Sequence, residues 1–158
     1  MKLKTFFIAA ILLAITSTIS AQNYITGIGG RVGFFNGITV KHFLNRENAV
    51  EGIVSFRWDG VIITGLYEWQ NPLPNARGFD YYVGLGGHIG IFDDYEWDDD
   101  DYDGTSTVVG FDLVLGLEYT FPQAPFTIGL DYKPAFNFIG DNHIWADGFA
   151  LNLRFNIN

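Results

Sequence analysis

The segment 93–103 carries the residues of this sequence that are best suited to bind a metal ion, with eight carboxylates in eleven positions. Within it, Asp99, Asp101 and Asp103 alternate with other residues and are followed by Gly104. That spacing lets successive carboxylates surround a hard cation, while the glycine allows a tight turn. Asp99, Asp101 and Asp103 are therefore candidate calcium ligands.

The same segment differs from an EF-hand in two ways. An EF-hand needs a glutamate at the twelfth loop position, which here is Gly110. It also needs a helix on each side, where this sequence predicts strands. Two interpretations of this segment remain: a less regular calcium-binding loop, and a solvated run of charges without a bound ion. Aromatic residues interleave with the acids and would also suit recognition of a basic or sugar partner; they are Tyr95, Trp97 and Tyr102.

The first 21 residues have the three parts of a secretory signal: Lys2 and Lys4, an apolar run, and small polar residues that end at Ala21. The apolar run, residues 6–15, is too short for an ordinary membrane-spanning helix. We therefore expect a signal peptide over 1–21 and one domain over 22–158.

The charge balance and the absence of cysteine exclude several classes of function. Nine basic residues face eighteen acidic ones, and two of the nine lie in the predicted signal. This balance opposes electrostatic binding to nucleic acid or anionic lipid, so we expect no nucleic-acid partner. Without cysteine the chain has no disulfide framework, no thiol chemistry and no acylated cysteine.

Apolar and polar residues alternate with a period of two almost everywhere after the signal, which is typical of strands with one apolar face. In 126–133, for example, Phe126, Ile128 and Leu130 share a face opposite Thr127 and Asp131. Short turn signals separate the segments, so they predict an antiparallel meander. The eight segments are 24–33, 38–44, 49–58, 61–69, 79–91, 106–119, 126–138 and 148–157.

The polar faces of these strands collect five cations and five anions. Equal numbers of the two signs favour charge pairs across a closed lumen, because a buried charge without a partner is very costly. A narrow channel is the other interpretation. The ten residues of this predicted network are Arg31, Lys41, Glu51, Arg57, Glu68, Asp112, Glu118, Asp131, Lys133 and Arg154.

The apolar faces decide between a soluble barrel and a membrane barrel. An eight-stranded barrel has room inside only for side chains or one small ligand. The aromatic residues of the apolar faces, among them Phe56, Trp69, Phe111 and Phe149, are too bulky for that space. Facing lipid, the same residues would form the outer band and the aromatic girdles of a membrane barrel. The sequence thus predicts an all-β, eight-stranded antiparallel up-and-down transmembrane β-barrel.

Several stretches resemble the small porin-like outer-membrane β-barrel proteins of Gram-negative bacteria, which have an OmpA/OmpX-like eight-strand plan. They are GITVKHFLNRENAVEGIVSFRW (37–58), TGLYEW (64–69), YYVGLGGHIG (81–90) and LDYKPAFNFIGD (130–141). The resemblance covers nearly the whole chain after the signal. One departure concerns the C-terminus, because such barrels usually end on an aromatic residue that the insertion machinery recognises. This chain ends with Phe155-Asn-Ile-Asn158.

The resemblance implies a bacterial outer-membrane location, with lipid and the barrel-insertion machinery as partners. It places both termini and the links 45–48, 70–78 and 120–125 in the periplasm, and the links 34–37, 59–60, 92–105 and 138–147 outside. We expect a monomer with no cofactor other than the calcium considered above. The external ligand is not identified by the sequence.

Some barrels of this plan modify lipid A with a histidine and a serine or aspartate, which makes a lipid-modifying enzyme the alternative. The candidates are His143, which lies between Asp141 and Asp147, and His88, which lies on a polar strand face. No serine is close to His143 in the sequence. We therefore expect a non-enzymatic protein with a structural or surface-interaction role.

The calcium hypothesis predicts that adding calcium to the detergent-refolded protein raises its melting temperature, because clustered carboxylates repel one another without a cation. Asp101→Asn should abolish this rise. A melting temperature that does not respond to calcium would leave the solvated charge run as the interpretation of this segment.

Overall fold

The computed structural model describes residues 25–57, 60–94, 104–140, 144–146 and 148–158. The predicted signal peptide, the candidate calcium ligands Asp99, Asp101 and Asp103, and His143 lie outside these residues.

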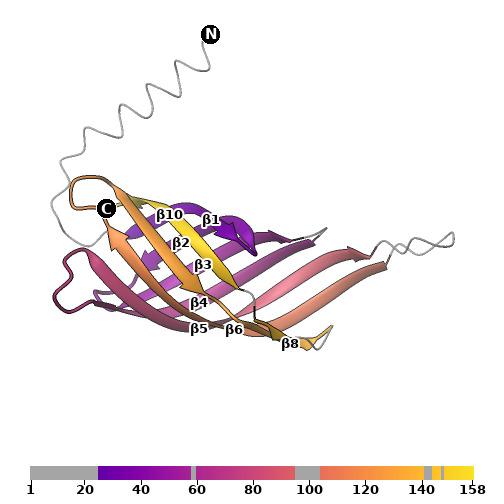
Figure 1. The fold of residues 1–158 in the computed structure, drawn as a ribbon. Helices are drawn as coiled ribbons and strands as arrows, with labels where there is room; N and C mark the ends of the chain where they lie inside the picture. Colours follow the sequence, from indigo (N-terminus) through magenta and orange to yellow (C-terminus); the bar gives the residue numbers. More distant parts are fainter. Residues whose placement is uncertain (1–24, 58–59, 95–103, 141–143, 147) are drawn as a thin grey trace, which may run out of the picture.

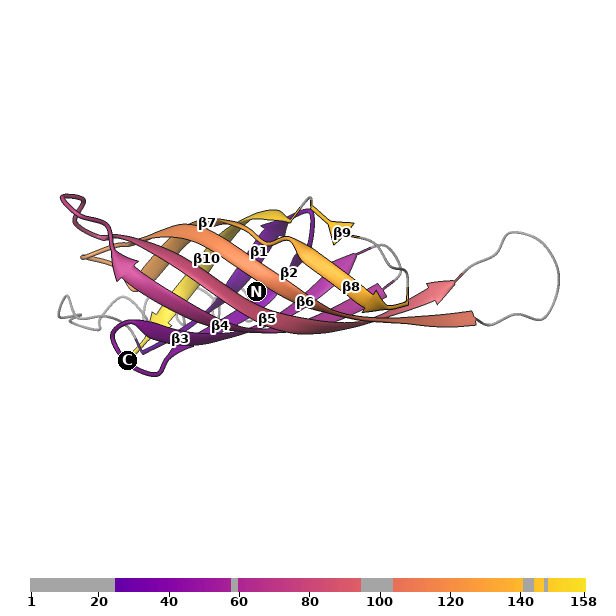
Figure 2. The ribbon, with the colours of Figure 1, turned by 90° about the horizontal axis from the view of Figure 1, so that it is seen from below.

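Antiparallel strands form one closed sheet (Figures 1 and 2). Each strand from β1 to β6 pairs with the next, β6 pairs with both β7 and β8, β7 pairs with β10, and β10 returns to β1. The strands are β1 (Thr26–Gly33), β2 (Asn36–Phe43), β3 (Asn48–Arg57), β4 (Gly60–Pro72), β5 (Phe79–Asp94), β6 (Gly104–Thr120), β7 (Phe126–Tyr132), β8 (Ala135–Ile139), β9 (Ile144–Trp145) and β10 (Phe149–Ile157).

The ten strands occupy eight positions around the barrel, and we call each position a wall. Strand β8 continues the line of β7 on one wall, and β9 precedes β10 on the neighbouring wall. The predicted eight-stranded antiparallel barrel is confirmed.

One predicted strand, 126–138, is interrupted. Pro134 has no N–H to donate, and regular pairing with the neighbouring wall stops beside it. Tyr132 pairs with Phe149, whereas Ala135 pairs with Trp145, so the β9–β10 wall has one extra residue opposite this point. Pro134 still accepts a hydrogen bond from the N–H of Leu113 at 3.1 Å, which keeps β6 attached across the break. Alternation alone did not reveal the interruption, since it continues through Pro134.

The barrel has two different ends. The end that we call the terminal end contains Asn158 and the connections 44–47, 73–78 and 121–125. The opposite end, called the loop end, contains the connection 34–35, the last residues of β3 and β5 and the first residues of β4 and β6. Strands β5 and β6 extend past the neighbouring strands at this end (Figure 2).

The inside and outside of the barrel are reversed relative to a water-soluble domain. Arg154 and Lys41 are fully buried, at 0% exposure, whereas Leu115 on the outer face of β6 is 57% exposed. Few apolar side chains lie inside, and the buried apolar cluster consists of Ile53, Leu66, Tyr82 and Val114. The strand alternation therefore places polar residues in the interior and apolar residues on the outer surface.

Tyr82 needs a glycine opposite it. Its ring crosses the interior from β5, and its cross-strand partner on β6 is Gly116. A Cβ at Gly116 would lie 2.3 Å from the Tyr82 ring, which is too close for any side chain. The absence of a side chain at Gly116 therefore makes room for the aromatic ring at the centre of the barrel.

Gly116→Ala should lower the free energy of unfolding by about 1–3 kcal/mol, because the added methyl group overpacks the interior against Tyr82. Denaturant titration of the refolded protein measures this. Gly65→Ala is the matched control: Gly65 faces outward with nothing within 4 Å of its would-be Cβ, so its effect should stay within about 0.5 kcal/mol. Equal stability of the two variants would contradict the packing described here.

Candidate functional site

The structure places all ten charged residues of the predicted network on the inner face of the barrel, and all but Arg57 are buried. They come from different walls and form three groups along the axis. The first group lies nearest the terminal end, and the third lies nearest the loop end.

The first group, called the five-charge cluster, consists of Lys41, Glu51, Glu68, Glu118 and Arg154. Arg154 reaches two carboxylates: its Nη2 lies 2.5 Å from Glu51 Oε1, and its Nη1 lies 3.2 Å from Glu118 Oε2. Lys41 Nζ lies 2.8 Å from Glu68 Oε2 and 3.2 Å from Glu118 Oε2. The cluster therefore links β2, β3, β4, β6 and β10 across the interior.

Neutral side chains add further hydrogen bonds to this cluster. Gln70 accepts a hydrogen bond from Lys41 Nζ at 2.6 Å and donates one to Glu118 Oε1 at 2.6 Å. Thr39 donates its hydroxyl proton to Glu51. Gln70 and Thr39 were not predicted as members of the charge network, although both occupy the same strand face as the charged residues.

The second group surrounds Asp131 near the middle of the barrel. Arg31 binds Asp131 through both terminal nitrogens, at 2.5 and 2.8 Å. The hydroxyl of Tyr82 donates to Asp131 at 2.9 Å, and the amide of Asn152 donates at 2.7 Å. Lys41 Nζ lies 4.0 Å from the centre of the Tyr82 ring, so this ring separates the second group from the five-charge cluster.

The third group contains His88, Asp112, Lys133 and Asn137. His88 Nδ1 is 2.7 Å from Asp112 Oδ2, and its Nε2 is 2.8 Å from Asn137 Oδ1. Lys133 donates to the other oxygen of Asp112. Both ring nitrogens of His88 are therefore hydrogen bonded to side chains of the barrel itself. This arrangement suits a structural histidine better than a catalytic one.

Aromatic rings cover the third group toward the loop end. Trp145 stacks on His88 with 5.6 Å between ring centres, and Phe35, only 3% exposed, lies 5.7 Å from Trp145. The guanidinium of Arg57 lies 4.4 Å from the centre of the Phe35 ring. The β1–β2 connection thus folds Phe35 inward at the mouth of the barrel.

Together these side chains close the described part of the lumen. The charged side chains of the five-charge cluster are buried, with exposures of 0 to 2%. A continuous water-filled passage along the axis would expose them. The arrangement can hold charges in fixed pairs and can resist deformation.

A third histidine, His42, and the remaining candidate residues lie outside these groups. His42 lies on the outer face, where its Nδ1 is 2.9 Å from the hydroxyl of Thr26. Asp99, Asp101, Asp103 and His143 are outside the described residues. Within the residues that are described, no group of three or more His, Cys, Asp or Glu side chains is arranged to hold a metal ion.

No protein-family model matches this chain, and a search of curated proteins finds no significant match. In the described ranges, no helix has the length and apolar character needed to cross a membrane.

Asp131→Asn should lower the free energy of unfolding by about 3–5 kcal/mol, because it leaves the buried Arg31 cation without its counter-charge. Tyr82→Phe is the control: it removes one hydrogen bond to Asp131 and keeps the ion pair, so it should cost about 0.5–1.5 kcal/mol. Denaturant unfolding of both variants measures the difference. Asp131→Asn costing no more than Tyr82→Phe would show that the ion pair does not hold the centre together.

Proposed function

We propose that this chain is an integral β-barrel protein of the bacterial outer membrane, with a closed, charge-paired lumen and a structural or surface-interaction role. The observation that carries this proposal is the sidedness of the barrel: charges are inside, and apolar side chains cover the outside.

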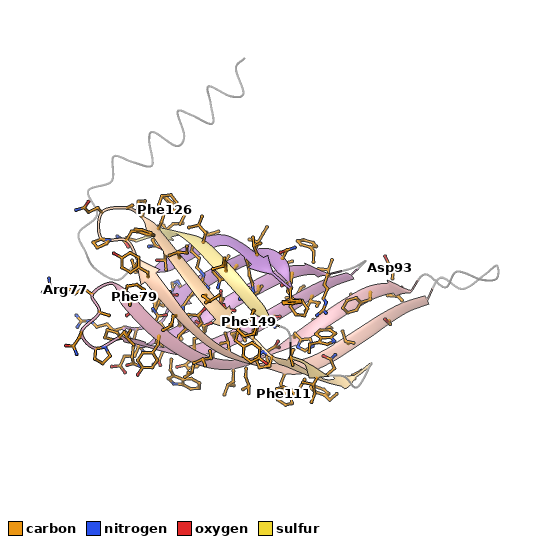
Figure 3. The ribbon with its side chains drawn as sticks, in the orientation of Figure 1. Arg77, Phe79, Asp93, Phe111, Phe126 and Phe149 are labelled. Carbon is orange, nitrogen blue, oxygen red and sulfur yellow. The ribbon has the colours of Figure 1, made fainter. Side chains whose placement is uncertain are left out.

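The outer face of the long hairpin shows this sidedness clearly. Outward positions of β5 and β6 are apolar along most of the barrel, as the sticks in Figure 3 illustrate around Phe79 and Phe111. Among the strand residues whose side chains are described, Asp93 at the loop end is the one Asp, Glu, Lys or Arg exposed on the outer surface. The large outward residues of this hairpin are Phe79, Tyr81, Val83, Leu85, Ile89, Ile91, Phe111, Leu113, Leu115 and Leu117.

A lipid environment is the solvent that suits this surface. Water-soluble monomers rarely expose a continuous apolar patch larger than a few hundred Å², because such a patch drives aggregation. When the same side chains contact hydrocarbon in place of water, their exposure carries no free-energy penalty. The closed sheet meets the second requirement of a bilayer, since it leaves few backbone N–H and C=O groups of the walls unpaired.

Aromatic residues support an orientation in the membrane. Trp69, Tyr81 and Tyr119 carry polar groups on their rings and lie toward the terminal end, together with Phe79 and Phe126 (Figure 3). Such residues are typical of the girdle at a membrane–water interface. Outer-membrane barrels place their short turns in the periplasm and their longer loops outside. The terminal end would then be periplasmic, and the acidic β5–β6 connection would belong to the external side, where a calcium ion or a partner could bind it.

The interior favours this role over the two alternatives. A narrow channel would need a path past the buried five-charge cluster. A lipid-modifying enzyme that uses His88 would need a ring nitrogen that is available to substrate, whereas Asp112 and Asn137 engage both. Outer-membrane lipid and the barrel-insertion machinery are the partners that this proposal includes.

Leu115→Arg tests the proposal, because Leu115 is 57% exposed near the middle of β6. In lipid vesicles the arginine should lower the free energy of unfolding by about 2–4 kcal/mol, since it places a cation in hydrocarbon. On a water-soluble barrel an exposed substitution of this kind would change stability by no more than about 0.5 kcal/mol.

Thr105→Arg is the matched control, because Thr105 is exposed at the loop end of the same strand. It should be close to neutral in vesicles. Folded protein should also migrate differently from heated protein in a detergent gel. A neutral effect of Leu115→Arg in vesicles, with no heat-dependent shift in mobility, would overturn the membrane assignment.

A further inference from the structure

We propose that the five-charge cluster is a binding site for one proton, which Glu68 carries and shares with Glu51. The site depends on the interior packing alone, whichever solvent surrounds the barrel.

The charges of the cluster do not balance when all groups have their ordinary ionisation. Glu51, Glu68 and Glu118 are three carboxyl groups, and Lys41 and Arg154 are two cations. All five side chains have exposures of 0 to 2%. Arg154 pairs with Glu51 and Glu118, and Lys41 pairs with Glu68 and Glu118. A buried negative charge without a counter-charge is very costly, and one bound proton makes the cluster neutral.

The position of the two carboxyl groups shows where this proton lies. Glu51 on β3 pairs with Leu66 on β4, so Glu68, two residues further along β4, is the diagonal neighbour of Glu51 on the inner face. Two ionised carboxylates in such positions repel each other and have no proton to share, because both groups only accept. Glu51 Oε2 and both carboxyl oxygens of Glu68 are buried without a hydrogen-bond partner. A proton held between the two groups satisfies these oxygens and the charge balance together.

The surrounding donors identify Glu68 as the protonated member. Glu51 accepts hydrogen bonds from Arg154 and from Thr39, which favour its ionised form. Glu118 accepts hydrogen bonds from Lys41, Gln70 and Arg154. Glu68 has the Lys41 ion pair and no donated hydrogen bond from a neutral side chain. Because donors stabilise a carboxylate, the proton belongs on the group that has fewest of them.

The other charged groups near the site do not replace the proton. Arg31 is paired with Asp131 on the far side of the Tyr82 ring. Asp80, which is half-buried on β5, is the cross-strand partner of Glu118 and supplies no cation. The phenol of Tyr82 is engaged with Asp131. Loss of the proton at alkaline pH would leave three buried carboxylates against two cations and would loosen the barrel at its terminal end.

Infrared spectroscopy of protein refolded in a detergent without ester carbonyls tests the site directly. The wild type at neutral pH should show the C=O stretching band of a protonated, buried carboxyl group, and the band should disappear at alkaline pH. Glu68→Gln should remove the band. Glu47→Gln, at an exposed turn position near the same end, is the control and should keep it.

Unfolding measurements give a second readout. Glu68→Gln should unfold at nearly the wild-type rate at neutral pH and should lose the acceleration that the wild type shows at alkaline pH. Glu51→Gln should unfold faster than Glu68→Gln at neutral pH, because it removes the negative charge that pairs with Arg154. If Glu68→Gln does not fold, the pH titration of the wild-type band decides. A wild type without the band, a band that persists in Glu68→Gln, or Glu68→Gln unfolding faster than Glu51→Gln would overturn the proposal.

Discussion

The pairing of β10 with β1 is the constraint on which the rest of this structure depends. From Thr26↔Ile157 to Gly33↔Ala150 it closes the sheet, so that every strand position faces either a narrow interior or the outside. Closure also pairs the backbone groups of what would otherwise be two open edges. Once the ring is closed, one face of each strand must fill a space that has room for little more than side chains.

The interior contains many charged side chains, and the way they are paired follows from the free-energy cost of burying a charge. A buried ion pair contributes stability only when its geometry and hydrogen bonds compensate for desolvation. Arg31 meets Asp131 through two nitrogens, while Arg154 and Lys41 each contact two carboxylates. Uncharged Gln70 and Asn152 supply the further donors and acceptors. The same network that connects the strands also fills the described part of the interior with paired charges.

The outer surface and the interior place opposite demands on the chain, and alternation satisfies both. The strands alternate between apolar and polar residues in the same way as a sheet with one buried face, but here the apolar face is on the outside of the barrel. Tyr82 shows how closely the two faces are adjusted: its ring enters the interior because Gly116 leaves space for it, while its neighbour Tyr81 points outward. A shift of register by one residue would exchange the two faces and place charges such as Lys41 on the outer surface.

Alternation along the chain is sufficient to predict the fold class, the strand positions within a few residues and the set of charged residues that share a face, because it is a local property that each segment displays independently. It did not reveal the interruption at Pro134, since alternation continues through it. Which charges meet depends instead on the three-dimensional arrangement of the strands. Arg31 and Asp131 are a hundred residues apart in sequence, and nothing local specifies that they pair. Their contact, the meeting of Arg154 with Glu51 and the capping of the interior by Phe35 depend on how closure staggers the strands around the barrel.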